Sequence, residues 1–373
     1  MLNLETTSEM TTGELCSYLD SAIPLSLQKN YDNSGLQIGR PEKVLEAALL
    51  TLDVTEEVLS EAVHKGCGII ISHHPVIFKG LKKLAWSTPA ERITALAIKN
   101  DISIYSAHTN LDMLGNGVSR KLAEKLGLTD VRVLQPLKGR LVKLVTFVPK
   151  EHLSRVRDAV FNAGAGFIGK YDRCGFEVSG TGSFRAGEGT NPFVGEQGQM
   201  HFEDETRFET VMFSHLKGKV VRALLEAHPY EEVAYDIYPL ENENTDLGLG
   251  CYGNLPAALD ERDFLELAAR RLEAGGLRHS SLNGNSIRKV AVCGGSGSSL
   301  LPDALACGAD AFVTGDIKYH SWFDADNRIL LADCGHFESE KFSVEVLHDL
   351  IIKNFPTFAV RFSETNTNPI NYL

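Results

Sequence analysis

The sequence has few cysteines and none with paired spacing. Seven are scattered along the 373 residues, and no two form a Cys-x-x-Cys pair. An odd, scattered set argues against a disulfide scaffold and against a zinc site built from thiolates, and it indicates a reduced, cytoplasmic protein. No apolar run approaches the roughly 20 residues that cross a bilayer. The first residues, MLNLETTSEMTTGEL, lack the basic and apolar stretches of a signal peptide, so we expect no membrane partner.

An excess of positive charge is also missing. The 49 acidic and 37 basic residues leave a net charge of −12 with histidine neutral. An acidic chain repels a phosphate backbone, which disfavours general DNA or RNA binding but still allows one nucleotide at a locally positive or metal-bearing site. Low-complexity tracts and short-period repeats are absent. With 43% hydrophobic residues, the composition is that of a globular protein, and its length suggests two or three domains of about 150 residues.

Short apolar runs alternate with amphipathic segments in the first and last parts of the chain. Helices are expected over about residues 56–65, 89–99, 260–272, 301–306 and 338–352. Strands are expected in AALLTLD (47–53), GIIISHHP (68–75), DISIYSAH (101–108), RKVAV (288–292), ADAFVTGD (309–316) and RILLADCGH (328–336). Continuous apolar runs bounded by turns and separated by helices indicate parallel strands buried on both faces. These parts therefore predict an α/β domain.

The middle of the chain has a different pattern. Strands are expected in LVKLVTFVP, in the alternating FEVSGTGSF region, in RFETVMFS and in VAYDIYPL, with helices in HLSRVRDAVFNAG and LKGKVVRALLEAHP. This order of strand, helix, two strands, helix and strand is the ferredoxin-like split pattern. We predict a small α+β domain at residues 136–245, inserted into an α/β domain whose two halves are residues 1–135 and 246–373.

The sharpest chemical feature is Ser72-His73-His74-Pro75 at the end of an apolar run. Adjacent histidines inside a strand would point to opposite faces of the sheet, but where the strand ends they can converge. Open α/β sheets place their sites beyond the carboxyl ends of the strands. Two imidazoles are costly to bury without partners, which favours metal binding over a hydrogen-bonded pair without a ligand.

Two further strand ends offer similar groups. The segment from His108 to Asp112 supplies nitrogen and oxygen ligands, although a loop aspartate is most often a turn or cap residue. After RILLA, His336 and Glu340 lie one helical turn apart, so they can share an ion. The alternative, an acid-rich helix amino terminus, explains Glu338 but leaves His336 unexplained, because a cation is disfavoured there.

Two weaker features follow other apolar runs. Asp316 and His320 have helical spacing, and they could orient metal ligands or act as a general base; a capping residue and a surface histidine are the alternative. The Gly294–Ser299 turn exposes amide groups that could receive phosphate. It matches neither a GxGxxG motif nor a Walker loop, and common tight turns share this composition.

Three strand ends together supply three imidazoles and two carboxylates: His73, His74, Asp112, His336 and Glu340. This set suits zinc first, with iron, manganese or nickel as alternatives, and is too rich in nitrogen for calcium. Five ligands exceed what one catalytic zinc uses. They fit two ions about 3.5–4 Å apart with a bridging carboxylate, for which Glu340 is our candidate. We therefore expect two divalent metal ions per chain.

The motifs resemble, in their order along the chain, the Nif-three-like dinuclear metal proteins, also called GTP cyclohydrolase I type 2 homologues. They are YDNSGLQIG (31–39), ISHHPVIFKG (71–80), SAHTNLD (106–112), TGDIKYH (314–320) and DCGHFESE (333–340). The segment ending in AHPYEEVAYDIYPL is similar to the CutA/PII-like insert of the longer bacterial members. Tyr31 departs from the tryptophan of many members. The resemblance implies a dinuclear centre on the same five residues, with Glu340 bridging, and a toroidal homohexamer.

These observations predict a metal-dependent hydrolase acting on a nucleotide or a similar phosphorylated small molecule, with Asp316 or His320 assisting proton transfer. For a GTP cyclohydrolase-like reaction, attack would occur at the purine C8 and formate would leave. The motifs of the cysteine-ligated zinc cyclohydrolase are absent. The alternative is a metal carrier or insertion chaperone, or a regulatory assembly whose insert senses a ligand without turnover. A third interpretation is an interaction protein with structural metal.

Overall fold

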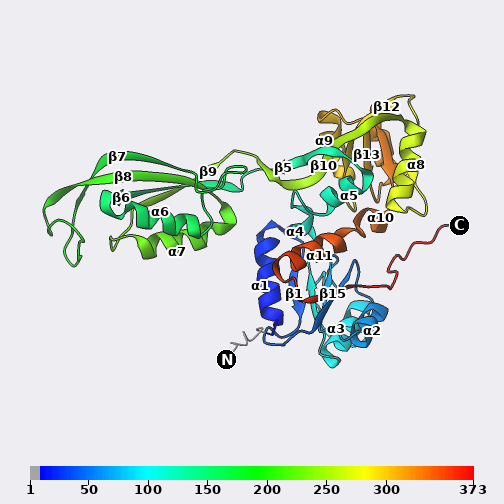
Figure 1. The fold of residues 1–373 in the computed structure, drawn as a ribbon, viewed down its shortest axis with the longest axis horizontal. Coiled ribbons are helices and arrows are strands. Elements are labelled where there is room, and N and C mark those ends of the chain that lie inside the picture. Colours follow the sequence, from blue (N-terminus) through cyan, green and yellow to red (C-terminus); the bar gives the residue numbers. More distant parts are fainter. Residues whose placement is uncertain (1–8) are drawn as a thin grey trace, which may run out of the picture. The chain divides into compact units, whose positions relative to one another are not determined.

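A computed structural model describes residues 9–373. The chain divides into two compact units, of which the first comprises the chain through Pro136 and from Thr245 to Leu373. The second unit is the intervening segment, Leu137–Asn244. Figure 1 shows the helices and strands of both units and labels most of them.

The first unit begins with a five-stranded sheet in the order β1-β4-β3-β2-β15. Its parallel strands are β2 (Ala47–Thr51), β3 (Ile69–Ser72), β4 (Ser103–Ser106) and β15 (Ala359–Phe362), and β1 (Gly35–Ile38) is antiparallel to β4. One face packs on α1 (Thr12–Ala22) and α11 (Ser343–Asn354), the other on α2 (Glu56–His64) and α3 (Pro89–Lys99). Helices on both faces explain why β2 and β3 are apolar at nearly every position.

A second sheet in this unit has the order β11-β14-β13-β12-β10-β5. Its strands are β5 (Thr129–Leu137), β10 (Asn244–Asp260), β11 (Arg278–His279), β12 (Ser286–Val292), β13 (Ala311–Thr314) and β14 (Leu330–Asp333). Strands β12, β13 and β14 are parallel. One face packs on α5 (Val118–Leu126) and α8 (Glu261–Leu272), the other on α9 (Leu301–Ala306) and η5 (Tyr319–Ala325).

The second unit is a four-stranded antiparallel sheet in the order β7-β8-β6-β9. Its elements are β6 (Leu141–Pro149), η2 (Lys150–His152), α6 (Leu153–Asn162), β7 (Gly175–Arg185), β8 (Met200–Phe213), η3 (Ser214–Leu216), α7 (Lys217–Ala227) and β9 (Tyr235–Leu240). Helices α6 and α7 pack with the sheet in one core. The sequence of elements and the strand order are those of the ferredoxin-like split pattern. The predicted fold class, an α/β domain with an inserted α+β domain, is confirmed.

The long helix expected over residues 338–352 is wrong in detail. The structure has two helices there, α10 (His336–Glu340) and α11. Phe342, at the break, packs against the core of the second sheet, whereas Val346 and Leu347 pack against the core of the first sheet. The helix breaks between α10 and α11 because the residues on the two sides of the break pack against the cores of different sheets.

Three short elements complete the first unit: η1 (Leu25–Leu27), α4 (Thr109–Asp112) and η4 (Ser298–Leu300). Among the helices of residues 9–373, none has the length and apolar character needed to cross a membrane. All seven cysteines are free thiols.

Candidate metal centre

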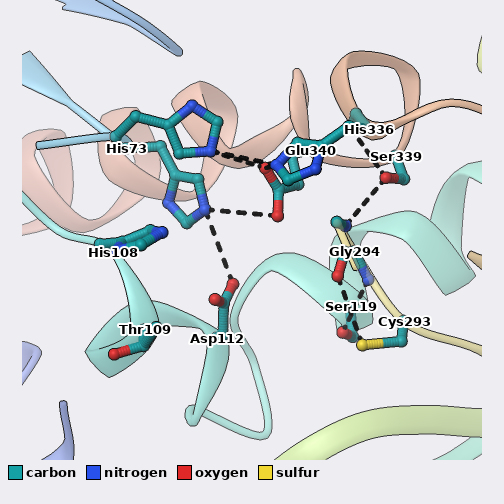
Figure 2. Close-up of polar contacts among 12 residues, drawn as sticks. His73, His108, Thr109, Asp112, Ser119, Cys293, Gly294, His336, Ser339 and Glu340 are labelled. Atoms are coloured by element: carbon teal, nitrogen blue, oxygen red, sulfur yellow. Dashed lines mark hydrogen bonds and ion pairs between the residues drawn. The ribbon is translucent and has the colours of Figure 1, made fainter. Parts of the chain in front are cut away.

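Six side chains with ligand atoms converge beyond the ends of β3, β4 and β14 (Figure 2). We call this set the cluster: His73, His74, His108, Asp112, His336 and Glu340. Their ligand atoms form three overlapping groups, each with all of its atoms within 4.8 Å of one another. The groups are His73 with His74 and His108, His74 with His336 and Glu340, and His73 with Asp112 and Glu340. The structure thus brings together all five residues predicted as metal ligands.

The two adjacent histidines turn toward one site because β3 ends at Ser72. The Ser72 hydroxyl donates to the carbonyl oxygen of His74 at 2.8 Å, and the His74 amide donates to the Leu52 carbonyl at 2.9 Å. Pro75 has no amide proton to continue the ladder. The rings of His73 and His74 lie 5.1 Å apart between centroids with a tilt of 45°, so they no longer point to opposite faces.

The short helix α10 supplies the other side of the cluster. Its spacing places His336 and Glu340 one turn apart, as predicted. Glu340 Oε2 lies 2.9 Å from Nε2 of both His336 and His74, whereas Oε1 lies 3.8 Å from Nε2 of His73. The two oxygens of one buried carboxylate therefore face two different groups of ligands. This is the arrangement expected of a bridging carboxylate.

Two buried atoms at the centre of the cluster have no hydrogen-bond partner: His73 Nε2 and Asp112 Oδ1. They lie 3.7 Å apart. The other ring nitrogen of His73 donates to the Ala107 carbonyl at 2.8 Å, so in the neutral ring Nε2 is a lone pair. A lone pair buried against a carboxylate is unfavourable unless a cation, either a proton or a metal ion, lies between them. The side chains present therefore fit a divalent metal ion.

Every histidine of the cluster is oriented through its Nδ1 atom. Nδ1 of His74 donates to Asp53 at 2.6 Å, that of His108 to Asp32 at 2.7 Å, that of His336 to Asp316 at 2.7 Å and that of His73 to the Ala107 carbonyl. These contacts leave Nε2 of each ring for the centre. A carboxylate or carbonyl behind each ring is the usual surrounding of metal-binding histidines.

Negative charge dominates the surroundings. Five carboxylates lie in or directly behind the cluster: Asp32, Asp53, Asp112, Asp316 and Glu340. Among the ion pairs of residues 9–373, none joins a lysine or arginine to any of them. Carboxylates that are paired only with histidines attract a further cation, a proton or a metal ion.

The negative charge of these carboxylates raises the pKa values of histidines in the cluster. Burial opposes the charged form of His74, but hydrogen bonds to Asp53 and Glu340 outweigh it and raise the pKa of His74 to about 10. The hydrogen bond to Glu340 is the main cause that raises the pKa of His336 to about 9, against some burial. In the absence of metal these rings hold protons at neutral pH. A metal ion must displace these protons, because it binds only the neutral ring.

The two residues predicted to be catalytic occupy different places. Asp316 has a left-handed backbone (φ +54°) that directs its carboxylate to His336, so it orients a predicted ligand. His320 is exposed in η5, where its ring contacts Tyr319, and it belongs to none of the three groups. The expected shared helix face is wrong, because η5 begins only at Tyr319 and Asp316 is outside it. The structure brings Asp316 to the cluster, but not His320.

The Gly294–Ser299 turn is occupied by contacts within the protein. The amide groups of its glycines donate to hydroxyl groups, Gly294 to Ser119, Gly295 to Ser339 and Gly297 to Thr314. The expectation that this turn offers these glycine amides to phosphate is therefore wrong. At Gly295 (φ +62°) a Cβ atom would collide with Glu340 Oε1, so the turn instead lets the backbone approach the carboxylate.

His108 lies in a segment that the sequence pointed to, but it was left out of the predicted set of five ligands. Its ring centroid lies 5.4 Å from that of His73 and 5.5 Å from that of His74. A signal was present, because His108 follows the end of β4 much as His73 follows β3. Its partner Asp32 lies in the segment between η1 and β1, which carried no separate prediction of a site.

The C-terminal tail contacts the residues behind the cluster. The hydroxyl groups of Ser363 and Thr365 donate to Glu61 at 2.6 and 2.7 Å. Farther along, the Thr367 hydroxyl donates to Asp53 Oδ2 at 2.9 Å, and the Asn368 side chain donates to Glu338 at 3.0 Å. Asp53 in turn contacts His74, and Glu338 lies between two cluster residues on α10. The tail therefore contacts both the residue behind His74 and the helix that carries His336 and Glu340.

Comparisons with known proteins agree with the motifs. The family model described as Duf34/NIF3 (NGG1p interacting factor 3) matches residues 10–369. A Halalkalibacterium halodurans protein named GTP cyclohydrolase 1 type 2 homolog is 44% identical over 315 residues, 84% of this chain and 85% of that protein. A Bacillus subtilis protein of the same name is 41% identical over 347 residues, 92% and 93% of the two chains. The crystal structure of a Bacillus cereus protein related to NIF3 superposes with a TM-score of 0.86 at 39% identity, covering 98% of this chain and 100% of that one. This chain belongs to the Duf34/NIF3 family.

Proposed function

We propose that the cluster binds two divalent metal ions and that the protein is a metal-dependent hydrolase acting on a nucleotide or another phosphorylated small molecule. The observation that carries the proposal is the position of Glu340, whose two oxygens face different groups of ligands. A carboxylate shared in this way is typical of two-metal hydrolytic sites. Zinc is the first candidate, because imidazole and carboxylate are present without thiolate; iron, manganese and nickel are alternatives.

The cluster has a closed side and an open side. The side chain of His73 is 0% exposed and that of Glu340 is 5% exposed, whereas that of His336 is 34% exposed. A structural metal site is closed on all sides, but a hydrolytic site keeps a position for substrate and water. The open side near His336 therefore supports turnover over a purely structural metal.

A pair of divalent ions lowers the pKa of water and polarises a carbonyl or phosphoryl oxygen. The residues of the chain determine where this chemistry takes place. Contacts at Nδ1 fix each ring with Nε2 directed inward, and the protein carboxylates behind the rings make the nitrogens better electron donors. Asp316, at the open side, holds the Nδ1 proton of His336 in a hydrogen bond of 2.7 Å.

GTP is the first substrate to test, because the two curated relatives are named GTP cyclohydrolase 1 type 2 homologs. The decisive experiment is metal analysis followed by a screen of GTP and phosphoesters on the wild type and on Glu340→Ala. Glu345→Ala is the matched control, because Glu345 lies on the neighbouring helix α11 and pairs with Lys125. We expect Glu340→Ala to lose metal and turnover together, and Glu345→Ala to keep both.

Turnover that continues unchanged in metal-free protein would contradict the hydrolase proposal. A wild type that binds two ions and converts none of the substrates would instead favour a metal carrier or a ligand-sensing assembly.

A further inference from the structure

We propose that the loop between β3 and α3 is the substrate-recognition element of this site: its lysines bind the phosphate groups of a nucleotide, and Phe78 with Tyr31 stacks on the base. The inference rests on the proposed function, because it concerns the same cluster. The loop begins with His73 and His74, directly after β3, and reaches α3 at Pro89. The glycine amides of the Gly294–Ser299 turn already donate to hydroxyl groups of the protein. The phosphate groups of a substrate therefore need other donors.

The aromatic part lies beside the cluster. Tyr31 is 66% and Phe78 41% exposed, and their ring centroids are 6.3 Å apart. The Phe78 ring lies 6.2 Å from the ring of His108. Asn33 donates to the Ile77 carbonyl at 2.5 Å, which holds this end of the loop against the segment that carries Tyr31. Exposed, adjacent aromatic rings form a platform on which a planar base can stack.

The charged part follows directly in the sequence. Lys79, Lys82 and Lys83 are exposed, and among the ion pairs of residues 9–373 none involves them. The carboxylates of the cluster repel an anionic substrate, and the chain as a whole carries a charge of −12. Three cations without ion-pair partners on the loop that carries His73 and His74 create a local attraction for phosphate. Phe78 and Lys79 are consecutive residues, so their Cα atoms are about 3.8 Å apart and the lysine branches from the chain next to the aromatic residue.

The ends of the loop are held and its middle is not. Glu91 on α3 accepts hydrogen bonds from the amides of Ala85 and Ser87 at 2.9 and 3.0 Å. Between Ile77 and these amides, residues 79–84 make no hydrogen bond in the described structure. The lysine side chains can therefore move onto a ligand without breaking a hydrogen bond or an ion pair of the described residues.

The test measures binding of inorganic triphosphate and of GTP to the full-length, zinc-loaded protein by calorimetry. Replacing the three lysines by glutamine should weaken both ligands about tenfold or more in low salt and reduce the salt dependence of binding. The matched control replaces three exposed lysines that make no ion pair, Lys99, Lys170 and Lys353, by glutamine. It should stay within about twofold of the wild type, because scattered surface charges contribute little.

The aromatic pair is tested in the same assay. A Tyr31→Leu/Phe78→Leu variant should weaken GTP about fivefold or more and leave triphosphate within about twofold, because only the base stacks on rings. All replaced side chains are exposed, and thermal unfolding checks that each variant folds. A wild type that binds no triphosphate, or a loop variant that binds as well as the control, would overturn the inference. Binding through the loop without any turnover would uphold it and contradict only the hydrolase proposal.

Discussion

At the scale of single residues, the site depends on side chains that make two directed contacts. Each histidine of the cluster uses Nδ1 for a protein oxygen and keeps Nε2 for the centre. The protein oxygen fixes both the tautomer and the plane of the ring. Removing the outer contact should therefore weaken metal binding although the ligand itself remains.

Asp316→Asn tests this at the open side of the cluster. Loss of the carboxylate behind His336 should lower metal affinity about 10- to 100-fold, measured by competition with a chromophoric chelator. Asp326→Asn is the matched control: Asp326 also has a left-handed backbone (φ +47°), but its carboxylate contacts Arg328. Asparagine tolerates this backbone region, so both variants should fold. Equal affinities in the two variants would refute a role of Asp316 through His336.

Metal binding should also release protons. The pKa of His74 is raised to about 10 and that of His336 to about 9, so both rings are protonated in metal-free protein at pH 7.5. A metal ion binds only the neutral ring, so affinity should rise with pH up to this range and fall on acidification. Calorimetry in two buffers of different protonation enthalpy measures the released protons. A binding enthalpy independent of the buffer would contradict the prediction.

The ligands that the sequence made predictable lie directly after a strand or within the short helix that follows it. His73 and His74 follow β3 with no gap, and Glu340 is on the same face of α10 as His336. Asp53 also lies shortly after a strand, β2. It acts by accepting the Nδ1 proton of His74, which follows the next strand, β3. Among these outer residues the sequence suggested only Asp316 as an orienting group, whereas Asp32 and Asp53 require the structure, because no local pattern reports a contact between distant segments.

At the scale of elements, tight turns bring the strand ends within reach of one another. Gly295→Ala should remove metal, because Gly295 has φ +62° and an added Cβ would collide with Glu340 Oε1. Gly308→Ala has nearly the same backbone (φ +70°) and nothing within 4 Å of the added atom. Both variants should lose about 1–2 kcal/mol of folding free energy from left-handed strain. Denaturant unfolding measures that loss, and metal content should fall only for Gly295→Ala; equal metal content would contradict the prediction.

The C-terminal tail is an element of irregular structure with a defined contact. Thr367→Val removes the hydroxyl that holds Asp53 behind His74, and metal affinity should fall about three- to tenfold, less than for a direct partner of the ring. Thr367→Ser should restore it. Thr365→Val is the control, because its hydroxyl binds Glu61 instead. In an Asp53→Ala background Thr367→Val should have no further effect; an additive loss would show that Thr367 does not act through Asp53.

Elements were predictable where a cap or a two-sided apolar pattern marks them. Helix α3 has Thr88 as its cap and Pro89 in its first turn, and its predicted bounds are confirmed. Helix α5 was missed, since Gly117 at its start provides no side-chain cap. Strand β15 was also missed, because it lies at the edge of the sheet and most of its residues are exposed.

At the scale of the whole molecule, the cluster and the insert are separate in their packing. All six cluster residues lie in the first unit. The core of the second unit contains only residues between Val142 and Ile237, and none of the other cores contains a residue of that range. The described cores of the first unit therefore contain no side chain from residues 142–237.

A chain without the insert should consequently keep its metal. Strands β5 and β10, which lead into and out of the insert, are neighbours in one sheet, and Gly248 lies against the carbonyl of Gln135. A short Gly-Ser linker can therefore replace residues 138–243. We expect the shortened chain to bind the same number of metal ions per chain as the wild type, measured by elemental analysis after dialysis. Glu340→Ala in the same shortened chain should lose them, which shows that the retained ions are bound at the cluster. A shortened chain that unfolds cooperatively but retains no metal would show that the insert contributes to the centre.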